Sequence, residues 1–310
     1  MSFGQPYAMT APAPLRGGFA DSEVQDVLKR ACTLVGLVGS EAELLRGHTN
    51  AVFRLLNHPV VVKIAPKGSP RSAVERTIAL VRWLMNQGFP TVPLHPVEQP
   101  ILIDDCHSAS FWVYLSQEDI EPVAAADLAG PLRILHSLPA PPVRLIEPDN
   151  IAAIRSSLRV ITLLSEDDLS FLGEQADRLE RALEHVEFVL PSAVVQGDPQ
   201  HRNALRDGDR TVLCDWDTVV WGRPDWDLVT IEIHCRRFGY SPEHYRAFVE
   251  GYGMDIRSSQ AYDVLRAVRE LRMITTNARK AHHTPGTLNE VRARIDGLRR
   301  GDVQQRWHIL

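Results

Sequence analysis

The chain has 310 residues, of which 44% are hydrophobic and 24% charged, and a formal net charge of −5 at pH 7. This length and composition fit one large domain or two lobes, and they exclude a disordered, collagen-like or disulfide-framework protein. The negative charge argues against a general nucleic-acid-binding protein. No apolar run approaches the roughly 18 residues that a membrane span needs, so we expect no membrane partner.

The N-terminal segment and the cysteines indicate the compartment in which the protein works. Residues 1–20 lack the basic cluster and apolar stretch of a secretory signal, and their prolines and glycines predict a flexible tail. The four cysteines are far apart and form no Cys-x-x-Cys pair. We therefore expect buried thiols in a reducing, cytoplasmic compartment and no zinc or redox centre.

The segment 21–115 predicts a small β-rich lobe. Apolar residues that share one helical face predict a helix at its start. Valine-rich and aromatic runs predict strands at 51–55, 60–64 and 111–115. A second helix is predicted after residue 70, with this apolar stripe: Val74, Ile78, Val81 and Met85.

From residue 116 to residue 310 the pattern becomes mainly helical. Apolar residues at helical spacing predict helices around 128–135 and 172–186, and then at 225–237, 242–252, 259–281 and 286–299. Between them short strands are predicted at 193–195, 204–205 and 211–214, with Asp207-Gly208 as a hairpin turn. The sequence thus predicts an α+β protein with two lobes and a boundary near residue 116.

The chemically dense stretch runs from Val194 to Leu228. Asp198 follows a β run and precedes a proline, so it is expected on a turn, and Asn203 ends the same loop. Asp215 closes the next strand, and the hairpin can bring it beside Asn203. A carboxylate and an amide oxygen on adjacent loops suit Mg²⁺, and a second carboxylate can orient a hydroxyl, as phosphoryl transfer requires. Loop aspartates are more often caps and turn formers, but that explanation weakens for an ordered trio.

Lys63 adds to this pattern. The chain has four lysines among 34 basic residues, and this one interrupts the run Val60-Val61-Val62-Lys63-Ile64. Strand interiors disfavour lysine, so a functional role is favoured over that of an ordinary edge-strand lysine.

Together these motifs resemble the aminoglycoside phosphotransferase family of kinase-like small-molecule kinases. The resemblance covers about residues 40–240 and rests on five stretches in the order of the family: Gly47-x-x-Asn50-x-Val52-Phe53-Arg54-Leu55 with Val62-Lys63-Ile64, Leu135-His136-Ser137-Leu138-Pro139, Gly197-Asp198-x-x-x-x-Asn203, Cys214-Asp215-Trp216-Asp217, and Gly222-x-Pro224-x-x-Asp227-Leu228. It implies a two-lobed protein-kinase-like fold, with a nucleotide-binding lobe over 21–115 and a catalytic and acceptor-binding lobe over 116–310.

In the N-terminal lobe the resemblance implies three nucleotide-binding features. Lys63 would contact the α- and β-phosphates, and Glu75 on the next helix would hold Lys63 through an ion pair, although Arg71 and Arg76 offer Glu75 other partners. The hinge facing the adenine or guanine ring would consist of Tyr114 and Leu115.

In the C-terminal lobe the resemblance implies that Asp198 orients the acceptor hydroxyl or accepts its proton. Asn203 and Asp215 would bind Mg²⁺, with Asp217 left open as a second carboxylate ligand. Asp227 would brace the catalytic loop through its backbone. Gln196 departs from the family, which usually has histidine here; glutamine can still donate a hydrogen bond to the metal-binding loop but cannot become cationic.

The expected partners are ATP or GTP and a hydroxyl-bearing small molecule, with the protein a monomer or dimer. Residues 222–310 hold 15 Lys and Arg against 11 Asp and Glu, whereas a pocket for a polycationic aminoglycoside would concentrate carboxylates. We therefore expect a less cationic acceptor, such as an antibiotic or related natural product. A metabolite kinase for a sugar or amino alcohol, a non-catalytic pseudokinase and a protein kinase stay open as alternatives.

Overall fold

The structure, a computed structural model, describes residues 21–47, 50–281 and 286–310. The tail expected at 1–20 therefore lies outside the described residues. Two units with mostly internal contacts make up the chain: residues up to 87 with 91–118, and residues 88–90 with 119–310.

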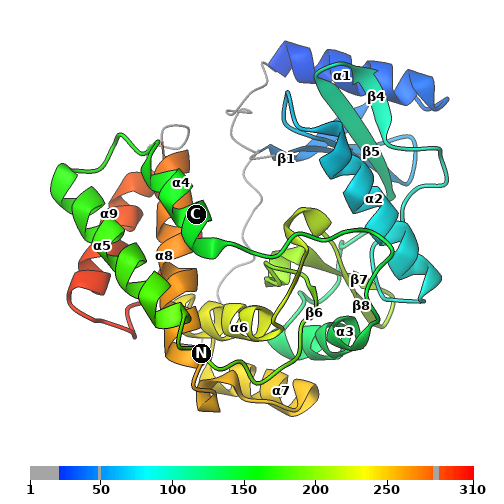
Figure 1. Cartoon of the computed structure of the whole chain (residues 1–310). Coiled ribbons are helices and arrows are strands. Elements are labelled where there is room, and N and C mark those ends of the chain that lie inside the picture. Colours follow the sequence, from blue (N-terminus) through cyan, green and yellow to red (C-terminus); the bar gives the residue numbers. More distant parts are fainter. Residues whose placement is uncertain (1–20, 48–49, 282–285) are drawn as a thin grey trace. The chain divides into compact units, whose positions relative to one another are not determined.

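The N-terminal unit is an antiparallel sheet with two long helices (Figure 1). The strands pair in the order β1-β2-β3-β5-β4. Its elements are α1 (Asp21–Leu34), β1 (Ala42–Gly47), β2 (Ala51–Leu55), β3 (Val60–Ile64), α2 (Arg71–Asn86), β4 (Ile101–Asp104) and β5 (His107–Val113).

Strict alternation along β3 decides which way Lys63 faces. Val60, Val62 and Ile64 are fully buried in a cluster with apolar residues of α1, because successive side chains of a strand point to opposite faces. Lys63 therefore lies on the other face of the sheet, in register with Val52 of β2. The charged side chain avoids the apolar core that the rest of its strand builds.

The C-terminal unit is mainly helical, with two small two-stranded sheets, β6 with β9 and β7 with β8. Its helices are α3 (Ala125–Ser137), α4 (Asn150–Leu158), α5 (Glu166–Leu183), α6 (Asp225–Arg237), α7 (Pro242–Tyr252), α8 (Tyr262–Lys280) and α9 (Thr287–Arg299). Its strands are β6 (Ala193–Val195), β7 (Ala204–Asp207), β8 (Arg210–Leu213) and β9 (Val220–Gly222). Short 3₁₀ helices lie at His201–Asn203, Trp216–Thr218 and Ile256–Ser258.

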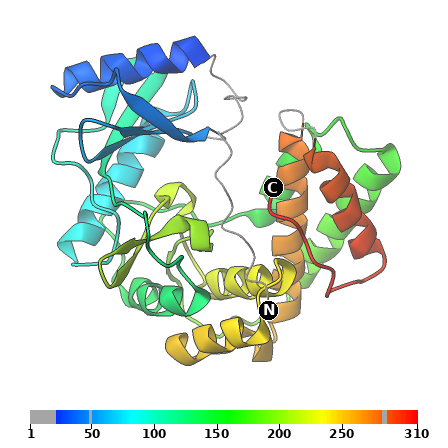
Figure 2. The ribbon, with the colours of Figure 1, turned by 180° about the vertical axis from the view of Figure 1, so that it is seen from behind.

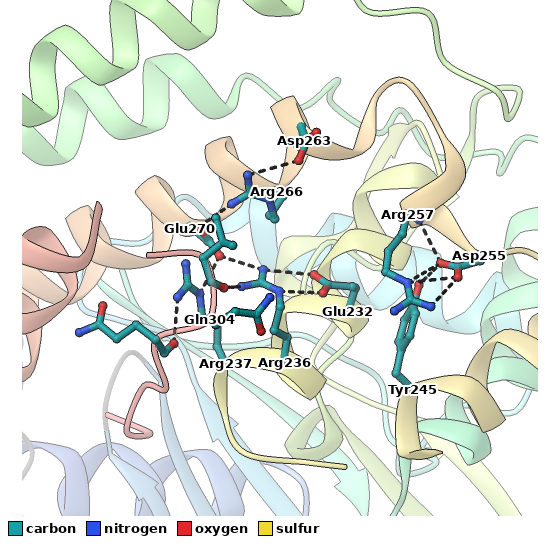
Figure 3. A network of polar contacts seen from close by, with 12 residues as sticks. Glu232, Arg236, Arg237, Tyr245, Asp255, Arg257, Asp263, Arg266, Glu270 and Gln304 are labelled. Atoms are coloured by element: carbon teal, nitrogen blue, oxygen red, sulfur yellow. Dashed lines mark hydrogen bonds and ion pairs between the residues drawn. The ribbon is translucent and has the colours of Figure 1, made fainter. Parts of the chain in front are cut away.

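Helix α8 is the centre of this unit. It packs against α4, α5, α6 and α9, while α7 lies along α3 (Figures 1 and 2). At its buried middle, Glu270 is fully buried and accepts hydrogen bonds from Arg237 at 2.8 Å, Arg236 at 2.9 Å and Arg266 at 3.3 Å (Figure 3). Removing one partner of a buried ion pair is strongly destabilising, so this cluster fixes α6 against α8.

The predicted α+β, two-lobed fold is confirmed. The strand predicted at 111–115 begins four residues and ends two residues too late, since β5 runs from His107 to Val113 and is followed by Tyr114 and Leu115. Helix α4 and strands β1, β4 and β9 were not predicted. In the part of the chain that the structure describes, no helix is both long and apolar enough to cross a membrane.

Candidate active site

The loop between β6 and the 3₁₀ helix His201–Asn203 carries Asp198. Its backbone N–H donates to Gln196 Oε1 at 2.7 Å, and its carbonyl accepts from Asn203 Nδ2 at 2.9 Å. Asn203 is buried, so its amide is held by this contact at the foot of the loop. The two polar residues that the sequence placed five positions apart are thus joined within one turn.

The β7–β8 hairpin carries the second half of the site. Strand β7 begins directly after Asn203, and the Cys214 N–H donates to the Asn203 carbonyl at 2.9 Å just beyond the paired strands. Asp215 follows Cys214 with a left-handed backbone, φ 59°, which ends the strand and starts the 3₁₀ helix that contains Asp217. The hairpin and its turn at Gly208 agree with the sequence prediction, and they bring the Asn203 and Asp215 backbones to the same end of the hairpin.

Gln196 ties the loop to the hairpin. While its Oε1 accepts from Asp198, its Nε2 donates to the carbonyls of Cys214 and Asp215, both at 3.2 Å. The residue is fully buried, so these contacts are shielded from water. Gln196 thus donates hydrogen bonds to the backbone beside Asp215, as expected of a glutamine here, while metal binding by this loop stays a prediction.

Asp227 of α6 braces the loop from below, as predicted. Its carboxylate accepts from the backbone N–H groups of Gln196 and Gly197, both at 2.8 Å. His136 of α3 contacts the same carboxylate through Nε2 at 3.1 Å and the Tyr252 hydroxyl through Nδ1 at 2.9 Å. The Leu-His-x-Leu-Pro element thereby connects α3 and α7 to the loop, a role that the motif alone did not reveal.

Electrostatic contacts converge on the Asp198 carboxylate. Its Oδ2 accepts from Gln200 Nε2 at 2.8 Å, and its Oδ1 accepts from Arg269 Nη2 of α8. Nearby, burial lowers the pKa of His234 to about 3, with Arg269 adding to the depression and Asp198 opposing it. Sequence reasoning missed Arg269, because a residue 71 positions from its partner carries no local signal.

The predicted nucleotide-binding residues lie in the N-terminal unit. Lys63 is half-buried on β3, opposite Ser110 of β5. Glu75 Oε1 accepts from Arg71 Nε at 2.6 Å in an exposed pair one helical turn apart. The Lys63–Glu75 ion pair therefore stays a prediction.

The hinge residues predicted from the resemblance follow β5 directly. The Tyr114 N–H donates to the Pro59 carbonyl at 2.9 Å, and the Arg54 guanidinium lies 4.1 Å from the centre of the Tyr114 ring. The Leu115 carbonyl accepts from Gln117 Nε2 at 3.2 Å. Both residues are thus held by hydrogen bonds in the segment that follows β5. Their contact with a purine stays a prediction.

Asn203 and Asp215 are residue types that could hold a divalent cation, and this role stays a prediction. Asn203 and Asp215 supply amide and carboxylate oxygens, the ligands that Mg²⁺ prefers, and Mg²⁺ sites usually take one or two carboxylates and complete the shell with water and phosphate. Among the described residues no group of three or more His, Cys, Asp or Glu could hold a metal.

An antiparallel sheet unit followed by a mainly helical unit that carries the Asp198 loop and the β7–β8 hairpin is the arrangement of kinase-like proteins. The chain belongs to the phosphotransferase enzyme family (APH), whose model matches residues 41–271. That membership makes it a small-molecule kinase. No curated protein matches the chain.

Solved structures share the fold at low sequence identity. A choline/ethanolamine kinase family protein from Mesorhizobium loti is 20% identical, with a TM-score of 0.63, and the match covers 89% of this chain and 91% of that one. The amicoumacin kinase hAmiN, in complex with AMP-PNP, Ca²⁺ and Ami, is 12% identical with a TM-score of 0.72 over 93% and 98%. A spectinomycin phosphotransferase in complex with ADP and spectinomycin is 14% identical with a TM-score of 0.61 over 89% and 93%.

Proposed function

We propose that the chain is an ATP- or GTP-dependent O-phosphotransferase that phosphorylates a hydroxyl of a small molecule, an antibiotic or a related natural product. The observation that carries this proposal is the joined loop and hairpin. Asp198 and Asn203 share a 2.9 Å hydrogen bond, and Gln196 joins Asp198 to the backbone of Asp215 beyond the end of β8. Phosphoryl transfer requires an oriented carboxylate beside oxygen ligands for a metal.

Each site residue then has a distinct role. Asp198 orients the acceptor hydroxyl and accepts its proton late, because the transition state of phosphoryl transfer is loose. Asn203 and Asp215 hold Mg²⁺, which when bound would neutralise phosphate charge. Lys63 contacts the α- and β-phosphates, as lysine does in kinases.

In this proposal other residues contact the purine base and hold Lys63 in position. Tyr114 and Leu115 face the purine, and Glu75 pairs with Lys63 once nucleotide is bound. The nucleotides in related structures, AMP-PNP with Ca²⁺ and ADP, support a nucleotide and a divalent cation here.

The charge of the C-terminal region bears on the acceptor. Residues 222–310 carry 15 Lys and Arg against 11 Asp and Glu, and one of these arginines, Arg269, reaches the Asp198 carboxylate. A cationic guanidinium at the reacting carboxylate disfavours a polycationic acceptor by like-charge repulsion. Neutral or weakly charged hydroxylated natural products fit this charge better. The solved structures do not separate the two kinds of acceptor, since they include a gentamicin complex as well as a spectinomycin complex.

A metabolite kinase for a sugar or an amino alcohol is the second candidate. The observation that favours it is the likeness to a choline/ethanolamine kinase family protein. An amino alcohol acceptor carries one positive charge. Arg269 would repel it more than it repels a neutral natural product, and in this the two candidates differ.

A substrate panel tests the proposal. The full chain is incubated with Mg²⁺ and ATP or GTP over small hydroxyl compounds, including antibiotics, sugars and amino alcohols, and nucleoside diphosphate is measured. We expect acceptor-dependent release that falls by about 10²–10⁴-fold in Asp198→Asn, the range of general base catalysis. Turnover that Asp198→Asn leaves unchanged would overturn the mechanism. Nucleotide binding without turnover of any compound would favour the pseudokinase alternative.

A further inference from the structure

Both oxygens of the Asp198 carboxylate are bound by side chains. Arg269 Nη2 donates to Oδ1 and Gln200 Nε2 donates to Oδ2 at 2.8 Å. A carboxylate has about four lone-pair sites, so two remain for an acceptor hydroxyl. The contacts therefore restrict rotation of the carboxylate without blocking it.

Arg269 is itself firmly held. It is only 7% exposed, and its guanidinium lies 5.5 Å from the centre of the Trp226 ring. Trp226 Nε1 donates to the Gly197 carbonyl at 3.0 Å, next to Asp198 in the chain. Arg269 thus contacts the loop in two ways. It binds the Asp198 carboxylate directly, and it lies against the Trp226 indole, which donates to the loop backbone at Gly197.

Burial of this guanidinium is costly unless it has an anionic partner. Its Nε is buried and makes no hydrogen bond, and within the described residues Asp198 supplies the one carboxylate within ion-pair distance of Arg269. His234, whose pKa burial lowers to about 3, is neutral near pH 7 and so adds no competing cation. Asp198 is therefore the group that accounts for the position of the Arg269 side chain.

The helix that carries Arg269 is anchored at the next residue. Glu270 is fully buried and bound by three arginines, two of them from α6, the helix that also carries Trp226 and Asp227 (Figure 3). A rigid element therefore presents Arg269 to the loop. Sites built on rigid helices hold a catalytic group more accurately than loops do.

We propose that Arg269 is a positioning residue that holds the Asp198 carboxylate in the orientation that aims the acceptor hydroxyl. The inference rests on the proposed function and adds a residue of α8 that lies outside the motifs. A misplacement of about 1 Å can lower turnover by about 10²-fold, so one fixed hydrogen bond at the reacting carboxylate can matter greatly.

The kinetic test compares Arg269→Met, which keeps the length but removes the charge, with Arg269→Lys, which keeps the charge. Turnover is nucleoside diphosphate release from MgATP with the acceptor found in the panel. We expect kcat to fall by about 10–100-fold in Arg269→Met and less in Arg269→Lys, while the KM for MgATP changes by less than about twofold. Unchanged kcat in Arg269→Met, or equal loss in both variants through KM alone, would overturn the proposal.

Arg257→Met is the matched control. Arg257 lies just before α8, pairs with Asp255 at 2.6 Å and has a side chain that is 52% exposed. The substitution removes an arginine of the same unit without touching Asp198 or Glu270, so kcat should stay within about threefold of the wild type. A loss equal to that of Arg269→Met would mean that the effect is not specific to the arginine that contacts Asp198, and would overturn the proposal.

A double-mutant cycle tests the contact without any acceptor. Urea unfolding of the wild type, Asp198→Asn, Arg269→Met and the double variant should show coupling of about fivefold or more in the unfolding equilibrium constant, since contacting residues are not additive. Additive effects would overturn the Asp198–Arg269 contact. If the wild type releases no nucleoside diphosphate yet the coupling is present, the proposed function fails while the contact is supported, so the two failures are distinguishable.

Discussion

Gln196 Nε2 donates to the carbonyl of Asp215 at 3.2 Å, across 19 residues of chain. The same side chain accepts from the Asp198 N–H, so one amide group joins the loop that would orient the acceptor to the hairpin that would bind the metal. A glutamine can do both at once because its amide has a separate donor and acceptor. Although the family usually has histidine here, Gln196 therefore still connects the Asp198 loop to the β7–β8 hairpin.

Gln196→Leu should weaken both loops. The substitution keeps the volume but leaves the Asp198 N–H and two carbonyls without this partner, which costs about 1–3 kcal/mol in a buried site. We expect kcat to fall by about tenfold or more, since the loop loses its registration. Gln196→His, the family residue, should restore most of the turnover. Activity in Gln196→Leu equal to that in the wild type would refute the connecting role.

Asp227→Ala tests the brace beneath the loop. The carboxylate is fully buried and accepts from two backbone N–H groups and His136, so its loss leaves buried donors unpaired. We expect the free energy of unfolding to fall by about 3–5 kcal/mol, measured by urea denaturation. Asp263→Ala, whose side chain is 82% exposed, is the control and should change it by less than about 0.5 kcal/mol. Similar values for the two variants would contradict the prediction.

Gly197 has two separate reasons to be glycine. Its φ is +87°, and a Cβ there would lie 2.3 Å from the Thr218 carbonyl oxygen, which cannot move aside as a flexible side chain could. Gly253 has φ +93° with nothing within 4 Å of its virtual Cβ, so Gly253→Ala measures the backbone cost alone, about 1–2 kcal/mol.

Gly197→Ala should therefore be worse than Gly253→Ala both in stability and in turnover. The clash forces the Asp198 loop away from Thr218, whose hydroxyl donates to the Gln196 carbonyl at 3.0 Å. Both variants are measured by denaturation, which reports backbone strain, and by nucleoside diphosphate release, which reports displacement of the Asp198 loop. Equal effects on turnover would mean that this close approach has no part in placing Asp198.

His234 predicts a dependence of stability on pH. Burial lowers its folded pKa to about 3, below the usual 6.5, with contributions from Arg269, His201 and Arg294 and an opposing one from Asp198. The unfolded chain then binds the proton more readily than the folded chain does. The contribution of neutral His234 to the free energy of unfolding is therefore fully present above pH 6.5 and is lost as the pH falls toward 3. Between pH 7 and pH 5 the wild type should lose roughly 1–2 kcal/mol more than His234→Asn. Parallel pH profiles would contradict this.

The sequence predicted the fold where local signals were strong. Strands β2 and β3 and helices α6 and α7 begin and end at the predicted residues. For β3 the signal is a valine run with one buried face, and for α7 it is the spacing of its apolar residues; the structure adds Ser241 as N-cap with Pro242 at the start of the helix. Each boundary depends on residues within one turn of it.

The candidate site shows the limit of such signals. The loop and the hairpin could be predicted from the spacing of Asp198, Asn203 and Asp215, because these residues are close together in the sequence. Arg269 joins Asp198 through the packing of α8, and no periodicity distinguishes it from the other arginines of that helix. Long-range pairs of this kind require the tertiary structure.

Lys63 provides the last prediction. It lies on the sheet face opposite the buried Val60, Val62 and Ile64, so its side chain can be changed without opening the core. Lys63→Met should therefore leave the free energy of unfolding within about 1 kcal/mol of the wild type.

Turnover should respond differently. If Lys63 contacts the α- and β-phosphates, Lys63→Met should lower kcat by about 10²-fold or more, as loss of a preorganised cationic donor does. Lys63→Arg should also work poorly, because a planar fork does not replace a compact ammonium. Lys67→Arg is the matched control: it lies four residues later, pairs with Glu23 at 2.6 Å and is 49% exposed, so we expect wild-type turnover. Full turnover in Lys63→Met, measured as nucleoside diphosphate release beside this control, would exclude the phosphate contact.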